Sequence, residues 1–279
     1  MNKLIIYSLI IIIIIIIIIV IRFLRFDTFT NKINHSVIIS GCARDCAKYL
    51  PKVLEKIKKL AEGKDVYYIF YENDSKDSTL KLLQDFINEN TNKGLLISEK
   101  LNIKRRTPRI AYCRNQILQH IYNNNLHKKY NYYINMDLDD VNKNLDVNSV
   151  NRCLSESNNW DIASVNQNRY YYDLWALRTE KKNNNCWYKE RCTNNRLDRW
   201  FNKFKKTNRI KINLPYIPVL SAFGGFTIYK TNLLNDSIYS GEDKINPIID
   251  DCEHVNFHES IFNNYPKTRF FIIPYMTNN

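Results

Sequence analysis

Three carboxylates follow an apolar and aromatic stretch near the middle of the chain. Residues 132–136 contain two tyrosines and an isoleucine, which favour a β-strand, and Asp137, Asp139 and Asp140 come directly after them. Open α/β folds bind ligands at the carboxyl ends of their strands. Oxygen ligands suit Mg²⁺ or Mn²⁺, which usually bind a few carboxylates together with substrate phosphates. The cluster therefore indicates an enzyme that acts on a nucleotide diphosphate, although a solvated turn would have the same composition.

A second polar cluster follows an earlier apolar stretch. Residues 66–71 predict a strand, and Glu72, Asn73 and Asp74 lie between it and a predicted helix. An acid at this position can hold a base edge or ribose hydroxyl groups, and the start of the helix favours phosphate. We therefore expect Glu72 and Asp74 to bind substrate. The alternative is a set of helix-capping residues without a further function.

Four arginines lie just before the acidic strand: Arg105, Arg106, Arg109 and Arg114. Guanidinium groups bind diphosphate and carboxylate oxygens through paired hydrogen bonds. Arg109 and Arg114 flank the start of a predicted helix, and we expect both to contact substrate. Arginines on an exposed helix surface would show a similar spacing.

Two further motifs supply a flexible backbone and aromatic rings. Gly224 and Gly225 allow the close approach of a ligand, or a turn with positive φ. Trp175, together with residues 170–172, is expected to form a wall on which a sugar stacks. Aromatic runs of this kind also occur in hydrophobic cores.

The elements that carry these residues alternate between strand and helix over about the first 140 residues. The predicted strands cover residues 36–41, 66–71, 95–98, 132–136, 162–165, 226–229 and 270–273. The predicted helices cover residues 47–60, 77–88, 110–122 and 197–204. This alternation predicts an α/β fold with a mainly parallel sheet flanked by helices. Residues 35–279 are expected to form one domain, preceded by an anchor and short stem in residues 1–34.

The order of the motifs is similar to that of GT-A-type nucleotide-sugar glycosyltransferases. The motifs that carry the resemblance are residues 72–79, 109–115, 137–140, 171–178 and 252–258. Within that group the chain resembles fungal capsule-associated and α-1,3-mannosyltransferase-like proteins and related enzymes of large DNA viruses. The resemblance covers about residues 36–275. It implies a GT-A, Rossmann-like fold.

The resemblance also implies roles for the acidic residues. Asp74 would contact the nucleotide. Asp137 and Asp139 would hold Mn²⁺ or Mg²⁺ and the diphosphate of the donor. Asp140 would be a third metal ligand or a contact to the sugar. The metal would neutralise charge on the departing nucleoside diphosphate.

The late motif, residues 252–258, is expected to complete the site. By the same resemblance, Glu253 would be the general base that accepts the proton of the acceptor hydroxyl, with Asp251 as the second candidate. His258, or His254 in its place, would complete the metal shell. The alternative is a buried core histidine beside helix-capping acids.

The beginning of the chain predicts a membrane anchor. Residues 4–21 are almost wholly aliphatic, and at ~1.5 Å of rise per residue they would span roughly 27 Å as a helix, close to the hydrocarbon thickness of a bilayer. We expect an uncleaved single-pass segment. Arg22, Arg25 and Lys32 follow it, against Lys3 before it, which favours the cytosolic face for the catalytic domain. The lumen of the endoplasmic reticulum or Golgi is the alternative, and the viral resemblance adds a host membrane or the virion.

Charge and cysteine content limit the partners. The net charge of +13 attracts anions such as nucleotide phosphates, an acidic acceptor or lipid headgroups, unless it is only a solvated lysine-rich face. No zinc finger, RNA-recognition signature or array of basic helices supports binding to nucleic acid. The seven cysteines show no metal-ligand spacing. Cys186 and Cys192 could pair in an oxidising compartment, although free thiols are expected.

These observations together predict a membrane-anchored, metal-dependent glycosyltransferase. It would move a sugar from a nucleotide diphosphate donor to a hydroxyl group of a glycan or protein. One alternative is a nucleotidyltransferase, which usually has a glycine-rich basic loop near its first strand. Residues 37–44 contain a single glycine, Gly41, which argues against this class. The other alternative is a catalytically inactive, membrane-tethered protein that binds nucleotide sugars.

Overall fold

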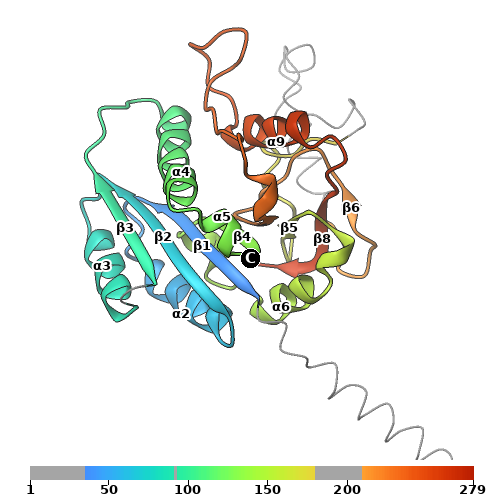
Figure 1. Cartoon of the computed structure of the whole chain (residues 1–279), viewed down its shortest axis with the longest axis horizontal. Helices are drawn as coiled ribbons and strands as arrows, with labels where there is room; N and C mark the ends of the chain where they lie inside the picture. The colour runs from blue at the N-terminus through green and yellow to red at the C-terminus, as the bar shows by residue number, and fades with distance from the viewer. Residues whose placement is uncertain (1–34, 91–92, 180–208) are drawn as a thin grey trace, which may run out of the picture. The chain divides into compact units, whose positions relative to one another are not determined.

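Eight strands form one sheet in the part of the chain that the structure describes, a computed structural model of residues 35–90, 93–179 and 209–279. In chain order they are β1 (Ser36–Ala43), β2 (Asp65–Asn73), β3 (Gly94–Glu99), β4 (Tyr132–Met136), β5 (Ile162–Asn166), β6 (Ile217–Pro218), β7 (Phe226–Lys230) and β8 (Phe270–Thr277). Their order across the sheet is β3-β2-β1-β4-β7-β5-β8-β6 (Figure 1). Residues His35 to Asn279 form one compact unit.

The sheet changes its pairing direction at β4. Strands β3, β2, β1 and β4 are parallel to one another, whereas β7 runs antiparallel to both β4 and β5. Strand β8 is parallel to β5, and β6 is antiparallel to β8. The α/β class is thus confirmed, but the sheet is mixed: β3, β2, β1 and β4 form a continuous parallel part, and β5 and β8 form a further parallel pair. The strand order also reverses at β1, because the chain runs outward through β2 to β3 and returns on the other side of β1 as β4.

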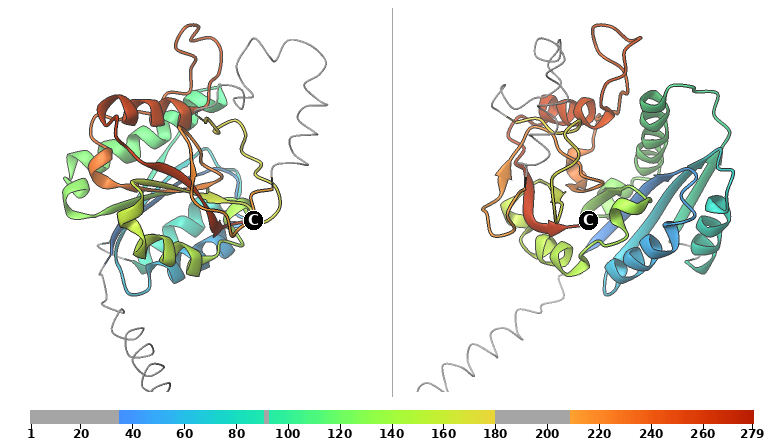
Figure 2. Two further views of the ribbon diagram at one scale, coloured as in Figure 1. Left: turned by 90° about the vertical axis from the view of Figure 1, so that its right-hand side faces the viewer. Right: turned by 180° about the vertical axis from the view of Figure 1, so that it is seen from behind.

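Side chains of the central strands alternate between two apolar clusters, one on each face of the sheet. In β1, Val37 and Ile39 belong to the first cluster and Ile38 to the second, as the period of two in a strand requires. The first cluster includes residues of α2 (Leu50–Ala61), α3 (Thr79–Glu89) and α6 (Val147–Ser155). The second includes residues of α4 (Arg106–Asn123), α5 (Leu126–Lys129) and α9 (Glu253–Asn264). The two helix layers lie on opposite faces of the sheet (Figure 2).

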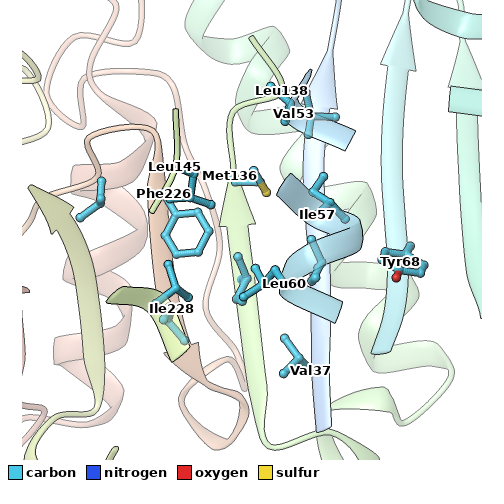
Figure 3. Close-up of a cluster of buried hydrophobic side chains, with 14 of the residues drawn as sticks. Val37, Val53, Ile57, Leu60, Tyr68, Met136, Leu138, Leu145, Phe226 and Ile228 are labelled. Atoms are coloured by element: carbon cyan, nitrogen blue, oxygen red, sulfur yellow. The ribbon is translucent and has the colours of Figure 1, made fainter. Parts of the chain in front are cut away.

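Helix α2 shows how the pattern of apolar residues determines the packing. Val53, Ile57 and Leu60 recur at helical spacing and pack against the sheet in the first cluster (Figure 3). Pro51 lies in the first turn, where its missing N–H needs no partner. The predicted start at residue 47 was early, because the chain first makes a turn at Cys46–Tyr49.

Two helices that frame the site differ from the prediction. Helix α4 begins at Arg106 rather than residue 110, so Arg106 and Arg109 both belong to it. Helix α9 was not predicted as a helix. Its residues from Glu253 to His258 are all buried although four of them are polar, so the segment lacks the apolar stripe that marks an amphipathic helix. Three short 3-10 helices, η1 (Asp140–Asn142), η2 (Ser157–Asn159) and η4 (Thr231–Leu233), complete the described elements.

Several predicted features lie outside the described ranges. They are the membrane anchor at residues 4–21, the helix at residues 197–204, and Cys186 and Cys192. Within the described ranges, no helix combines the length and the apolar character needed to cross a membrane. The cysteines in those ranges are free thiols.

Candidate active site

A cavity of about 380 Å³ lies at the carboxyl ends of β1 and β4, where the strand order reverses. Its walls come from the end of β1, from α4, from the turn after β4 and from the start of α9. Open α/β sheets bind their ligands at such a position. The cavity therefore brings together motifs that are far apart in the sequence.

The turn after β4 supplies two carboxylates to this cavity. Asp137 and Asp139 both line it, and Leu138 between them is buried in the first apolar cluster. Burial raises the pKa of Asp137 to about 7; Arg114 opposes this shift and Asp139 adds to it. Burial also raises the pKa of Asp139. The two acids thus form a site at which added positive charge would be stabilising.

Arg114, on α4, joins the acidic turn to the late motif. It is 4% exposed, and its Nη2 donates to Asp137 Oδ1 at 3.2 Å while Nη1 donates to Glu253 Oε1. The rings of Phe223 and Tyr239 lie near the guanidinium, with centroids at 5.0 and 5.7 Å. Burial disfavours the charge, but Glu253 and Asp137 raise the pKa of Arg114 above its ordinary value. One buried cation thus holds an acid from each half of the chain.

A second cavity, of about 470 Å³, lies between the segments that follow β2 and β3. Asp74 lines it, and its Oδ2 accepts hydrogen bonds at 3.1 Å from the Asn73 side chain and from the Leu101 main-chain amide. These bonds lower the pKa of Asp74. The cations that line the cavity are Arg44, Lys76, Lys100, Lys104 and Arg109. Arg44 and Arg109 also line the first cavity, so the two cavities are neighbours.

Side-chain to main-chain hydrogen bonds connect the loops after β1 and β2. Asp45 Oδ1 accepts from the Lys76 amide at 2.7 Å, and the Asp45 amide donates to Ser75 Oγ at 3.1 Å. Asp77 Oδ2 accepts from the Ala47 amide at 3.0 Å. Asp45 and Asp77 therefore hold the two loops together, and neither lines these two cavities.

Glu72 and Asp140, both predicted to bind substrate, lie outside the linings of these two cavities. Glu72 is 3% exposed, and its carboxylate accepts from the Ser75 amide at 2.8 Å and from Ser98 Oγ at 2.7 Å. Both of its oxygens are used in holding the turn after β2. Asp140 begins η1 at the surface and pairs with Lys143 at 3.5 Å. These contacts favour a structural role for Glu72, and the role of Asp140 as a substrate contact stays a prediction.

The two glycines support the acidic turn instead of lining the cavity. Gly224 and Gly225 have φ values of +64° and +86°, which glycine adopts without strain. The Gly225 carbonyl accepts a hydrogen bond at 2.9 Å from the Asp137 amide. Asp251, the second candidate for the base, also lies outside the cavity lining, and its Oδ1 accepts from the Cys252 amide at 2.7 Å. Glu253 remains as the base candidate.

His258 is fully buried, and both of its ring nitrogens have partners. Ser221 Oγ lies 2.8 Å from Nδ1, and the Tyr229 hydroxyl lies 2.9 Å from Nε2. Burial lowers the pKa of His258 to about 3, so the ring is neutral. Because neither nitrogen is available and the residue does not line the cavity, we remove His258 from the metal shell. His254 is the histidine of the cavity wall, where it stacks on Phe223 with ring centroids 3.7 Å apart.

The segment that contains Trp175 contributes two predicted residues, Trp175 and Tyr172, and one that was not predicted, Asp173. Trp175 lines the cavity, as do Tyr172 and Asp173. Asp173 Oδ2 accepts from the Gly224 amide at 2.9 Å, and burial raises the pKa of this carboxyl group. Asp173 does not follow a predicted strand, so its position in the sequence did not indicate a site residue. The only signal was its place between aromatic residues that resemble those of the glycosyltransferases.

The acids present fit a divalent metal only in part. Among the described residues, no three His, Cys, Asp or Glu side chains are placed to hold a metal ion by themselves. Mg²⁺ and similar ions, however, are often bound by one or two carboxylates, with water and substrate phosphates as the other ligands. Asp137 and Asp139 provide such a pair, and burial already disfavours their negative charge. The donor set therefore suits a metal that is shared with a phosphate ligand.

Comparison with known families gives one match in sequence. The family model described as Cryptococcal mannosyltransferase 1 matches residues 36–265. No curated protein matches the chain.

Three solved structures are distantly similar to the chain. TarS (residues 1-349) of S. aureus has 13% identity and a TM-score of 0.46, over 85% of this chain and 57% of that one. The mannosyltransferase PcManGT of Pyrobaculum calidifontis, in complex with GDP-Man and Mn²⁺, has 10% identity and a TM-score of 0.43, over 75% and 49%. Glucosyl-3-phosphoglycerate synthase of Mycobacterium tuberculosis, with Mn²⁺, UDP and phosphoglyceric acid, has 9% identity and a TM-score of 0.42, over 84% and 66%. The chain thus spans about half to two thirds of the length of these proteins.

Proposed function

Because this chain belongs to the Cryptococcal mannosyltransferase 1 family, we propose that it moves a sugar from a nucleotide diphosphate donor to a hydroxyl acceptor. The observation that carries the proposal is the cavity at the carboxyl ends of β1 and β4. There Asp137 and Asp139 lie with a buried arginine and a further acid, Glu253. The family name makes mannose the first sugar to test.

The donor would extend across both cavities. Its nucleoside would lie in the cavity lined by Asp74, whose carboxylate can accept a hydrogen bond from a base edge or a ribose hydroxyl. Its diphosphate would lie beside Arg44 and Arg109, because these two cations line both cavities. Guanidinium groups suit phosphate oxygens, and the charge of these arginines would attract the donor.

The sugar would then lie beside Asp137 and Asp139. Mn²⁺ or Mg²⁺ held by these two carboxylates and the diphosphate would neutralise charge on the leaving group. Arg114 would hold Asp137 in place. Trp175 and Tyr172, in the same wall, would pack against the sugar ring.

Glu253 is the proposed general base. Its carboxylate would take the proton of the acceptor hydroxyl as the acceptor oxygen bonds to the anomeric carbon. The bond from that carbon to the diphosphate oxygen would break, and its electron pair would leave with the nucleoside diphosphate. Arg114 fixes the orientation of Glu253 through their ion pair.

The sequence supports a membrane location for this reaction. The apolar run at residues 4–21 would anchor the domain, and the basic residues that follow it favour the cytosolic face. The acceptor would then be a glycan or protein close to a membrane.

Release of nucleoside diphosphate is the test of the proposal. The full chain in detergent would be incubated with Mn²⁺ and a panel of nucleotide sugars, GDP-mannose first, with and without hydroxyl acceptors. We expect one donor to be turned over and to raise the melting temperature only with Mn²⁺. Asp139→Ala is the matched control. Binding without turnover of any donor would favour the inactive binding protein, and release of pyrophosphate from a nucleoside triphosphate would favour a nucleotidyltransferase.

A further inference from the structure

We propose that Asn142 and Asn278 are positioning residues that hold the turn of Asp137 and Asp139 in its metal-binding shape. Neither residue lines the cavity, and both are fully buried. Asn142 ends η1, directly after the turn, and Asn278 follows β8 near the C-terminal end marked in Figure 1. The proposal rests on the proposed function, because the turn is the proposed metal site.

Asn142 fixes the main chain of the first acid. Its Nδ2 donates to the Asp137 carbonyl at 2.8 Å and to the Gly225 carbonyl at 2.6 Å. The Gly225 carbonyl also accepts from the Asp137 amide at 2.9 Å. The amide and the carbonyl of Asp137 are therefore both held by one small network. This leaves its main chain little freedom to rotate.

Asn278 supports that network from the far end of the sequence. Its Nδ2 donates to Asn142 Oδ1 at 3.0 Å and to the Gly224 carbonyl at 2.8 Å. The orientation of each side-chain amide is determined, because a flip would place oxygen against oxygen. Among the described residues, Oδ1 of Asn278 has no hydrogen-bond partner. An unpaired oxygen on a buried amide is destabilising. Asn278 therefore stabilises the turn through the two hydrogen bonds that its Nδ2 donates.

The acidic turn needs such support because its carboxylates repel each other. Asp137 and Asp139 line the same cavity with only Leu138 between them. Without a fixed main chain, the two side chains would relax apart. The fit behind the turn is also close: a Cβ atom on Gly225 would lie 2.5 Å from Val141 Cγ1. Groups that orient metal ligands in this way commonly change metal affinity or activity by ~10–100-fold when they are replaced.

The test compares Asn278→Ala and Asn142→Ala with Thr231→Val. Thr231 is a buried residue whose Oγ1 donates to the Tyr130 carbonyl, and it follows the end of β7 that pairs with the start of β4, away from the acidic turn. Mn²⁺ binding to the full chain would be measured by electron paramagnetic resonance, alone and with GDP. We expect the dissociation constant to rise ~10-fold or more in both asparagine variants. The control should bind Mn²⁺ like the wild type, even though it is also less stable.

Hydrogen exchange of residues 137–142 gives a second readout that needs no metal. Exchange should become faster in Asn278→Ala and stay unchanged in Thr231→Val. Should Asn142→Ala fail to fold, Asn278→Ala still decides the question. Unchanged exchange in Asn278→Ala would overturn the positioning role, whatever the metal does. Exchange could be faster in Asn278→Ala while the wild type binds no Mn²⁺. That result would support the positioning role and refute the proposed metal site.

Discussion

The affinity of the protein for Mn²⁺ should rise steeply as the pH increases from 6 to 8. Burial raises the pKa of Asp137, a proposed metal ligand, to about 7. A metal ion binds the ionised carboxylate, so below pH 7 it must first displace a proton. With this pKa, Asp137 is roughly 9% ionised at pH 6 and roughly 91% ionised at pH 8, so the dissociation constant should fall by about tenfold. The raised pKa of Asp139 acts in the same direction.

Titration calorimetry of the full chain with Mn²⁺ would measure this effect. Buffers with different ionisation enthalpies would give the number of protons released, which should approach one near pH 6 and fall towards zero at pH 8. In Asp137→Asn the affinity should be low and should change less with pH. A dissociation constant that is the same at pH 6 and pH 8 in the wild type, without proton release, would refute the reasoning.

The stability of the metal-free protein provides an independent check. The folded state holds a proton on Asp137 between the ordinary carboxyl pKa of 3.8 and about 7, whereas the unfolded state does not. The contribution of this residue to stability should therefore decrease as the pH rises through that interval. Urea unfolding of the wild type and of Asp137→Asn at pH 5 and pH 7.5 would measure it. A wild type that loses no more stability than the variant would contradict the assignment.

Three substitutions test the remaining roles. Asp139→Ala should abolish sugar transfer while costing about 1 kcal/mol of stability, because it removes only one capping hydrogen bond; transfer at the wild-type rate with Mn²⁺ would exclude Asp139 as a ligand. Glu253→Gln should keep the affinity for donor in calorimetry and lower kcat by roughly 10²–10⁴-fold, the usual size of a general-base effect; normal turnover at saturating donor would make Glu253 a binding residue. His258→Ala should leave Mn²⁺ affinity unchanged and lower the free energy of unfolding by roughly 1–3 kcal/mol, because two buried partners lose their hydrogen bonds; weaker Mn²⁺ binding would restore it to the metal shell.

The sequence predicted local features well, because strand and helix patterns depend on neighbouring residues. Strand β4 was expected at residues 132–136 and occupies them. The acids that follow it could be located for the same reason, since a strand that ends in carboxylates is visible in the sequence alone. The apolar spacing of α2 likewise indicated the face by which it packs.

Features that depend on distant partners could not be predicted. Glu72 and Asp74 are separated by one residue, and the sequence does not distinguish their roles. In the structure, Ser98 of β3 donates a hydrogen bond to Glu72, so this carboxylate stabilises the fold. The partners of His258 come from β7 and from an irregular segment, so its role as a core residue was invisible in the sequence. The antiparallel insertion of β7 between β4 and β5 is also non-local, so the strand–helix alternation in the sequence could not reveal that the sheet is mixed.

The ion pair between Arg114 and Glu253 would limit which parts of related chains can be exchanged by recombination. Asp137 and Asp139 precede residue 140, as does Asp74 in the neighbouring cavity, whereas Tyr172, Glu253 and the other late residues of the first cavity follow it. This division would let a lineage change its acceptor by exchanging the second part of its gene. Arg114 belongs to the first part, however, and its partner Glu253 to the second. An incoming segment without an acid at that position would leave the buried guanidinium with Asp137 alone of its two carboxylate partners, which would be destabilising. Only segments that bring their own acid at the start of α9 are compatible with this first half.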